Sequence, residues 1–372
     1  MRYGMNPHQK AQLVGDPGHV RVLNGAPSLI NWLDLLNAWM LVRDIRSNLG
    51  RPAAASFKHV SPAGVAIAGD VDACAADLWR VGREVSGSLL SAYVRARDAD
   101  PKSSFGDVVA LSEPCDVATA GFLGQVIADA VIAPGFDPGA LPVLGRKKAG
   151  SFLVVQVDPD YEPPRRESRE VFGVRLDQDR DDEPLGAHLP AMPHRDDALL
   201  GLATLRYTQS NSVCAGRDGM VLGIGAGQQN RVDCTRLAGV KARTWWLRRH
   251  PIVASLRCQG MPRQDLLNWR IRFAEQSLTR HQTGQLADLF GPSALADYDR
   301  PDWRAEWLAQ WSGLVMCSDG FIPFRDNVDV AAEMGVTTIV EPGGSARTPE
   351  VGAAAAEHGI THITTGLRLF HH

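Results

Sequence analysis

The sequence predicts an α/β fold built from more than one unit. Short apolar runs rich in alanine, valine and isoleucine alternate with stretches of helical spacing along the 372 residues, and this alternation is typical of sheets covered by helices. Hydrophobic residues make up 44% of the chain and charged residues 22%, which is ordinary for a globular protein. Because this length exceeds one typical domain, we expect two or three.

The predicted strands and helices follow from apolar runs and from the residues that end them. Apolar runs indicate strands at residues 53–57, 126–133, 152–157, 220–224 and 336–340. A long helix is predicted over 30–49, because leucine and methionine recur there at four-three-four spacing and Gly50-Arg51-Pro52 can stop it. A second helix is predicted over 348–358, followed by Gly359 and another short strand.

Two segments rich in charged residues and proline indicate connections between elements. They cover residues 158–170 and 177–197, and such composition is typical of loops. The boundary between two units is therefore predicted near residue 190, which gives units at 1–190 and 191–372. Residues 259–311 have the pattern of helices with charged faces and are predicted to be an insertion in the second unit. No short-period repeat is visible, but a diverged duplication would escape that test.

The charge and cysteine content narrows the class of protein. The formal net charge is −3 and no long basic run offsets it, which argues against a general nucleic-acid or membrane binder. An anionic ligand must then be held by a few well-placed cations. The six cysteines form no CxxC pair, so we expect reduced thiols and neither a zinc site nor a disulfide framework. No stretch reaches the ~18 apolar residues of a membrane helix, and the cytosol is the expected compartment.

Lys58 and His59 are a candidate catalytic pair. They follow directly after the strand predicted at 53–57, and Ser61-Pro62 follows them with a turn signal. Ligands of open α/β sheets bind at strand ends. The positive charge of Lys58 favours a neutral imidazole on His59, which is the form that accepts a proton as a general base. Taken alone, the pair also fits a purely structural role.

Five further segments combine polar, aromatic and glycine residues in a way that a buried core does not require. They are residues 2–9, 103–107, 206–213, 223–231 and 318–327. Aromatic side chains among carboxylates and an amide, as in the last of these, suit a planar heterocycle. The glycines at 223–227 either let a ligand approach the backbone or make a tight turn. They lack the third glycine of a dinucleotide fingerprint and the lysine of a phosphate-binding loop.

In this order and with these residues, the segments resemble AICAR transformylase, where AICAR is 5-aminoimidazole-4-carboxamide ribonucleotide. The resemblance extends from Arg2 to the C-terminal residues 367–372 and covers essentially the whole chain. In most organisms this transformylase is the C-terminal half of a bifunctional purine-biosynthesis protein. The resemblance implies two cytidine-deaminase-like α/β/α subdomains, a small helical insertion, and a homodimer whose active sites lie across the interface. The zinc site of true deaminases is not expected, since Cys115 has no second cysteine at the required spacing.

The resemblance also implies transfer of a formyl group from 10-formyltetrahydrofolate to the 5-amino group of AICAR. That amine is a weak nucleophile, because its lone pair is delocalised toward the carboxamide, so its proton must be removed during attack. By resemblance, His59 is the base. Lys58 either stabilises the tetrahedral oxyanion or supplies the proton to the departing folate nitrogen.

The remaining site residues come from the same resemblance. The phosphate of the nucleotide is assigned to Arg2, Tyr3 and Arg368. The ribose is assigned to Gly106 and Asp129, and the base with its carboxamide to Asn211, Arg231 and Phe370. The folate pterin and formyl group are assigned to Phe321, Asp326 and Asn327. Family members also bind a potassium ion near the segment that matches residues 207–212, through carbonyl oxygens that leave no sequence signature.

Two alternatives to primary purine synthesis stay open at this point. The sequence starts at the transformylase motif, without the cyclohydrolase half, so we expect ring closure to come from a separate IMP cyclohydrolase or the chain to serve another pathway. It would then be a paralogue that formylates a related amino-heterocycle nucleotide. A non-catalytic nucleotide- or folate-binding subunit is the other alternative, and the Lys58-His59 pair speaks against it.

Overall fold

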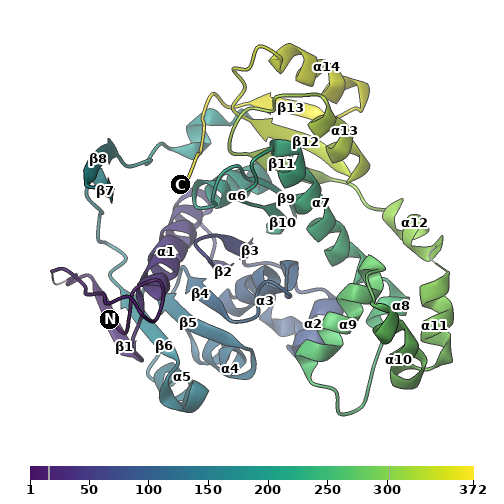
Figure 1. Ribbon diagram of the computed structural model, residues 1–372, viewed down its shortest axis with the longest axis horizontal. Coiled ribbons are helices and arrows are strands. Elements are labelled where there is room, and N and C mark those ends of the chain that lie inside the picture. The colour runs from purple at the N-terminus through teal and green to yellow at the C-terminus, as the bar shows by residue number, and fades with distance from the viewer. Residues whose placement is uncertain (16, 301) are drawn as a thin grey trace.

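The computed structural model describes residues 1–15, 17–300 and 302–372. Its centre is one mixed sheet of eleven strands in the order β1-β6-β5-β4-β2-β3-β10-β9-β11-β12-β13, and a second, small sheet pairs β7 with β8. Helices pack on both faces of the large sheet (Figure 1). The predicted α/β class is thereby confirmed.

Residues 1–157 form what we call the first half of the large sheet. Its strands are β1 (Val20–Asn24), β2 (Ala53–Phe57), β3 (Pro62–Ile67), β4 (Asp107–Leu111), β5 (Ala128–Ala133) and β6 (Leu153–Val157). Its helices are α1 (Leu29–Leu49), α2 (Ala73–Trp79), α3 (Leu89–Ala99), α4 (Val117–Gln125) and α5 (Ala140–Arg146). Strand β2 is antiparallel to β3 and β4, whereas β4, β5 and β6 are parallel to one another.

Residues 195–372 form the second half. Its strands are β9 (Val213–Arg217), β10 (Met220–Gly225), β11 (Leu314–Ser318), β12 (Val336–Glu341) and β13 (Thr361–Thr364). The helices that cover them are α6 (Arg195–Arg206), α7 (Arg231–Leu247), α13 (Asp326–Glu333) and α14 (Thr348–Glu357). Strand β9 is antiparallel to β10 and β11, whereas β11, β12 and β13 are parallel.

The two halves therefore have the same order of elements and the same strand directions. When α2 of the first half and the helices between α7 and β11 of the second half are left out, the succession α1-β2-β3-α3-β4-α4-β5-α5-β6 returns as α6-β9-β10-α7-β11-α13-β12-α14-β13. The halves meet where β3 pairs antiparallel with β10, with Val65 opposite Val221. Because these central strands are antiparallel, equivalent strand ends of the two halves lie at opposite ends of the sheet. The sequence shows no short-period repeat, so only the fold reveals this duplication.

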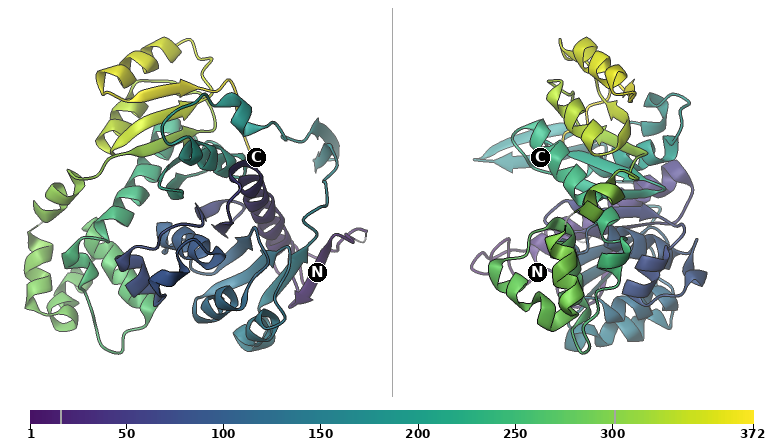
Figure 2. Two further views of the ribbon diagram at one scale, coloured as in Figure 1. Left: turned by 180° about the vertical axis from the view of Figure 1, so that it is seen from behind. Right: turned by 90° about the vertical axis from the view of Figure 1, so that its right-hand side faces the viewer.

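Two segments stand apart from the duplicated sheet. Helices α8 (Pro251–Ala254), α9 (Arg263–Glu275), α10 (Arg280–Phe290), α11 (Pro292–Asp299) and α12 (Asp302–Leu308) lie between α7 and β11 and enclose an apolar cluster of their own, centred on Phe273. The hairpin of β7 (Arg166–Val171) and β8 (Val174–Asp179) is exposed along its whole length and stands away from the body of the molecule (Figures 1 and 2).

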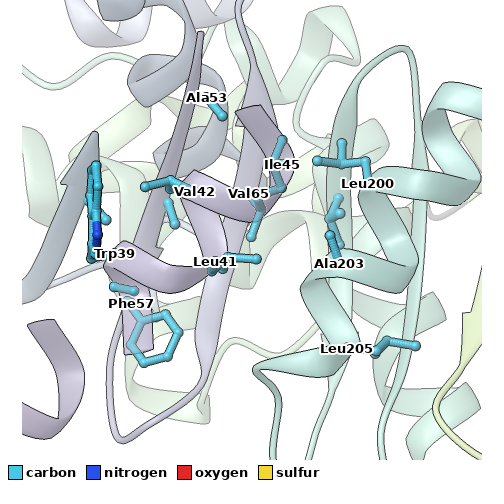
Figure 3. Packing of buried hydrophobic residues seen from close by; sticks show 14 of the residues in the cluster. Trp39, Leu41, Val42, Ile45, Ala53, Phe57, Val65, Leu200, Ala203 and Leu205 are labelled. Atoms are coloured by element: carbon cyan, nitrogen blue, oxygen red, sulfur yellow. The ribbon is translucent and has the colours of Figure 1, made fainter. Parts of the chain in front are cut away.

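Helices α1 and α6 lie side by side on one face of the sheet. In Figure 3, Leu41 and Ile45 of α1 and Leu200 of α6 surround Val65 of β3, so the packing on this face joins the two halves. Helix α1 begins with a capping box from Ser28 and ends at Gly50 in the left-handed conformation.

On the other face, one helix of each half lies unusually close to its strand. A Cβ atom added to Gly64 of β3 would lie 2.1 Å from the Ala96 carbonyl oxygen of α3. A Cβ atom added to Gly223 of β10 would lie 1.9 Å from the Ala238 carbonyl oxygen of α7. Only glycine fits such an approach, and the two positions are equivalent in the duplicated topology.

Most predicted elements are confirmed, and the connections are partly wrong. The strands at 53–57, 126–133, 152–157, 220–224 and 336–340 and the helices at 30–49 and 348–358 correspond to β2, β5, β6, β10, β12, α1 and α14 within two residues at each boundary. Residues 158–170 and 177–197, predicted as connections, instead contribute to β7 and β8, a 3₁₀ turn at Leu185–His188 and the start of α6. Their charged composition fits an exposed hairpin equally well, because neither of its faces is buried.

All six cysteines are free thiols. Among the described residues, no helix is both long enough and apolar enough to span a bilayer, and no cluster of three or more His, Cys, Asp or Glu side chains is arranged for a metal ion.

Candidate active site

The chemistry-bearing segments gather at one end of the sheet, which we call the site end. Strand β2 finishes there at Phe57, opposite Val108 at the start of β4. Strand β10 finishes there at Gly225, opposite Val213 at the start of β9, and β11 finishes there at Ser318. The loops that follow or precede these strand ends are the segments that the sequence singled out.

Lys58 and His59 lie in the tight loop between β2 and β3. The Lys58 amide donates to the Ser61 carbonyl at 2.9 Å and closes the loop. The Lys58 ammonium donates to the Phe105 carbonyl at 2.8 Å, while the His59 side chain is exposed. His59 and Val60 have φ of 57° and 55°, a left-handed conformation that non-glycine residues adopt rarely and β-branched residues more rarely still. Strain of this kind clusters at functional sites.

Gly106 and Asp129 are neighbours on the first-half side of the site end. A Cβ atom added to Gly106 would lie 3.8 Å from Asp129 Oδ1, and Gly106 itself has a left-handed φ of 73°. Asp129 forms an ion pair with Lys148. Beneath them, the buried Arg97 guanidinium donates to Asp107 at 2.8 Å and to the Ile127 carbonyl at 2.9 Å, which fixes the starts of β4 and β5.

A pocket of about 440 Å³ opens on the second-half side of the site end. Its lining combines amides, carboxylate and guanidinium groups with aromatic rings: Asn211, Gln229, Asn230, Arg231, Val232, Phe321, Pro323, Phe324, Asp326, Asn327 and Phe370. All three rings in this lining, those of Phe321, Phe324 and Phe370, are between 43% and 51% exposed. A planar heterocycle can therefore lie against aromatic faces while its edge meets amide groups.

Arg231 organises the polar wall of this pocket. Arg231 as a residue is 7% exposed, and its guanidinium forms an ion pair with the fully buried Asp319. It also donates to Ser318 Oγ at 2.9 Å and to Asn211 Oδ1 at 2.7 Å. Accepting from Arg231 orients the Asn211 side-chain amide, so both groups are held in place before a ligand binds.

Cys234 lies beneath the same wall but is not suited to be a nucleophile. Its Sγ atom contacts the Asn211 carbonyl at 3.1 Å. Burial raises the pKa of the Cys234 thiol to about 11, so the thiol is protonated at neutral pH and lacks the reactive thiolate form.

The predicted site residues fall into three groups in space. Six line the pocket: Asn211, Arg231, Phe321, Asp326, Asn327 and Phe370. Arg368 lies beside it, with its guanidinium 4.7 Å from the centre of the Phe370 ring. Lys58, His59, Gly106 and Asp129 form the first-half group described above. The two groups adjoin, because the Gln209 amide donates to Ser61 Oγ at 3.3 Å.

Arg2 and Tyr3 form the third group, at the start of α1. The Arg2 amide donates to the Pro27 carbonyl at 3.0 Å, and the Tyr3 carbonyl accepts from the Leu29 amide at 3.1 Å. The Arg2 side chain reaches Asn31 Oδ1 at 3.5 Å.

Two of the three glycines at 223–227 have a different role from those predicted for the segment, whereas Gly227, with φ of 67°, lies in the loop after β10 and fits the predicted turn. Gly223 and Gly225 are buried in β10 and face α7; a Cβ atom on Gly225 would lie 2.2 Å from the Cys234 carbonyl oxygen. These glycines therefore allow close helix packing and face neither a ligand nor a turn. Spacing alone did not reveal this, because a glycine under a helix and a glycine under a ligand look alike in sequence.

Sequence reasoning missed three residues that support the site. Asp319 pairs with Arg231, Lys148 pairs with Asp129, and Asp34 of α1 accepts from the Val60 amide at 2.7 Å. Asp319 lies within a segment that the sequence singled out, and Lys148 ends a run of three basic residues that begins at Arg146. Asp34 carries no local signal, because it lies in the middle of a helix far from the loop in sequence.

Comparisons with known proteins give a consistent result. The model of the family described as "AICARFT/IMPCHase bienzyme" matches residues 1–241. Proteins named "Bifunctional purine biosynthesis protein PurH" from Roseobacter denitrificans and Cereibacter sphaeroides are each 32% identical to the chain, over 388 and 387 residues. A protein of the same name from Magnetococcus marinus is 32% identical over 390 residues. Each alignment covers 100% of this chain and 59% of the relative, so the chain spans about three fifths of their length.

Proposed function

The chain belongs to the AICARFT/IMPCHase bienzyme family, and from this premise we propose that it is a folate-dependent formyltransferase. The proposed reaction moves the formyl group of 10-formyltetrahydrofolate to the 5-amino group of AICAR and yields 5-formamidoimidazole-4-carboxamide ribonucleotide in de novo purine synthesis. One observation carries the proposal: the Lys58-His59 loop adjoins a pocket lined by aromatic rings, amides and a buried arginine.

His59 acts as the base in this proposal. Its exposed imidazole, on a loop held by Asp34 and Ser61, accepts the proton of the amine as nitrogen attacks the formyl carbon. Lys58 then serves the oxyanion or the leaving folate nitrogen. Its hydrogen bond to the Phe105 carbonyl at 2.8 Å restricts the position of the ammonium before the substrates bind. A preorganised cation suits either role, because it needs no rearrangement during the reaction.

The nucleotide and the folate divide the remaining residues. Asn211 and Arg231 bind the carboxamide and base against Phe370, while Gly106 and Asp129 bind the ribose. Arg2, Tyr3 and Arg368 bind the phosphate. Phe321, Asp326 and Asn327 hold the pterin near the formyl carbon. The rigid Arg231–Asn211 hydrogen bond of 2.7 Å and the aromatic rim support this division.

Several wider expectations belong to the same proposal. The units at 1–190 and 191–372 are two cytidine-deaminase-like subdomains, with an insertion at 259–311, and the repeated strand order supports this division. The enzyme acts in the cytoplasm as a homodimer with shared active sites. A potassium ion lies near 207–212. Among the described residues the buried Ser212 hydroxyl has no hydrogen-bond partner, which leaves one oxygen in this segment free to contact such a cation.

The test is a direct assay of the purified chain with AICAR and 10-formyltetrahydrofolate, followed by the absorbance of released tetrahydrofolate. We expect turnover that falls by roughly 10²- to 10⁴-fold in His59→Ala and by a similar factor in Lys58→Ala. His281→Ala, which changes an exposed histidine of the helical insertion, should leave kcat unchanged.

Absence of turnover by a folded wild-type chain would refute the assignment to AICAR. Faster formylation of another amino-imidazole nucleotide would point to the paralogue instead. Binding of AICAR or folate without any turnover would point to the non-catalytic subunit.

A further inference from the structure

The duplicated fold uses the same device twice to hold a hairpin loop against a helix. In the first half, Asp34 Oδ1 of α1 accepts from the Val60 amide of the β2–β3 loop at 2.7 Å, and the His59 amide also donates to this carboxyl. In the second half, Asp197 of α6 accepts from the Gly219 amide at 2.7 Å and from the Asp218 amide at 3.2 Å in the β9–β10 loop. Each aspartate is only 9% exposed.

The two loops differ in how readily they adopt the conformation that the aspartate holds. The β9–β10 loop is Asp218-Gly219, with φ of 54° and 72°, a sequence that enters the left-handed region readily in two-residue hairpins. The β2–β3 loop places a histidine and a valine in the same region, which is unfavourable for both. The first loop therefore depends on its aspartate far more than the second does.

The surroundings of Asp34 point the same way. Burial raises the pKa of the Asp34 carboxyl, and the opposing contributions come from the amides of Val60 and His59 and from the charges of His59 and Lys58. Within the described residues no arginine or lysine forms an ion pair with Asp34, whereas the buried Asp98 and Asp107 pair with Arg248 and Arg97. A buried carboxylate without a cation is unfavourable for stability. Asp197 shares this feature, since its one ion pair in the described residues is with His194 at 3.8 Å, so Asp34 differs from it in the loop that it holds.

We propose that Asp34 is a positioning residue, which holds the left-handed loop so that the His59 imidazole and the Lys58 ammonium face the reacting groups. The proposal rests on the formyl transfer inferred above and assigns Asp34 no contact with either substrate. Without its acceptor, the loop relaxes toward the ordinary β or right-handed conformations, which redirects the His59 side chain. Asp197 performs only the structural part of the same task.

The duplication supplies a matched control for the experiment. Asp34→Ala and Asp197→Ala each remove a buried acceptor of two hairpin amides, so we expect similar decreases in melting temperature. Asp34→Ala should lower kcat by about 10²-fold, the cost of misplacing catalytic groups by about an ångström, with the KM for AICAR within about twofold of wild type. Asp197→Ala should retain the wild-type kcat. Asp34→Asn keeps one acceptor oxygen and should recover most of the lost kcat.

Amide hydrogen exchange gives a second readout that needs no activity. Asp34→Ala should speed exchange in the peptide containing residues 58–61 and leave 217–220 protected, and Asp197→Ala should do the reverse. If the wild-type chain does not turn over AICAR, the proposed function fails, and exchange still decides whether Asp34 holds the loop.

Three outcomes would overturn the proposal. The first is wild-type kcat in a folded Asp34→Ala variant, and the second is unchanged exchange at 58–61. The third is an equal loss of kcat in both alanine variants, which would mean that Asp34 affects kcat only through the stability of the fold.

Discussion

The two halves of the sheet share one topology, but the equivalent hairpin loop has a different role in each half. At the site end, the β2–β3 loop is open and presents Lys58 and His59. At the opposite end, the β9–β10 loop is closed: a Cβ atom on Gly219 would lie 2.7 Å from Ile67 Cγ1, and the Arg95 guanidinium binds the Asp218 carbonyl. The duplicated fold therefore contains two equivalent hairpin loops, one at each end of the sheet. The length and the side chains of each loop decide whether that end of the sheet carries reactive groups.

The largest expected effect comes from exchanging the two loops. Replacing residues 58–61 with Asp-Gly, as found between β9 and β10, should preserve the fold, since Asp34 can accept from the new amides as Asp197 does. It removes base and cation together, so we expect kcat to fall by at least ~10⁴-fold. Steady-state kinetics and circular dichroism would measure both properties. A folded variant with a rate within tenfold of wild type would contradict the functional difference between the halves.

The next largest effect is expected from a change in the pocket, whose lining residues all belong to the second half. Arg231→Met leaves the fully buried Asp319 without its cation, and breaking a buried pair in this way costs about 3–5 kcal/mol of stability. Urea unfolding would measure that loss. The double variant Arg231→Met with Asp319→Leu removes both charges and should regain much of the stability but not the affinity for AICAR, measured by calorimetry. Undiminished affinity in the double variant would remove Arg231 from the binding role.

A smaller and symmetric effect should follow where the halves are alike. Gly64→Ala and Gly223→Ala each force a methyl group against a helix carbonyl oxygen, and overpacking of this kind costs roughly 1–3 kcal/mol. We expect the two losses, measured by urea unfolding, to agree within the error of the method. Gly121→Ala, where an added Cβ meets no atom within 4 Å, serves as the control. A loss confined to one variant would mean that the close approach is not equivalent in the two halves.

The smallest effect concerns the hairpin that belongs to neither half. Phe172 at its tip is fully exposed, and Val171, Val174 and Leu176 are more than half exposed. Phe172→Ser should therefore change the unfolding free energy of the isolated chain by less than about 0.5 kcal/mol. The hairpin already contacts the C-terminus, where the Arg169 guanidinium donates to the His372 carbonyl, so a larger loss in dilute solution, with no change in sedimentation, would show that the Phe172 ring also packs against its own chain.

Local patterns predicted many, but not all, of the elements that have a local signal. Strands β4 and β11 are short apolar runs that were not predicted. The strand at β2 reads as an unbroken apolar run, and α1 has both its spacing and its stop at Gly50. Strand β3 was missed because it begins with proline and contains Gly64, residues that usually interrupt strands. Gly64 is nevertheless required, because α3 crosses β3 too closely for any side chain.

The sequence by itself determined the α/β class, the family and the segments that carry the chemistry, because helix spacing, strand runs and ordered motifs are properties of neighbouring residues. The tertiary structure alone decided that the fold is duplicated, that Asp319 pairs with Arg231 in the pocket wall, and that Asp34 supports the Lys58-His59 loop. The physical reason is that strand pairing and a buried hydrogen bond join residues far apart in the chain, and neither leaves a trace in the local pattern at either partner.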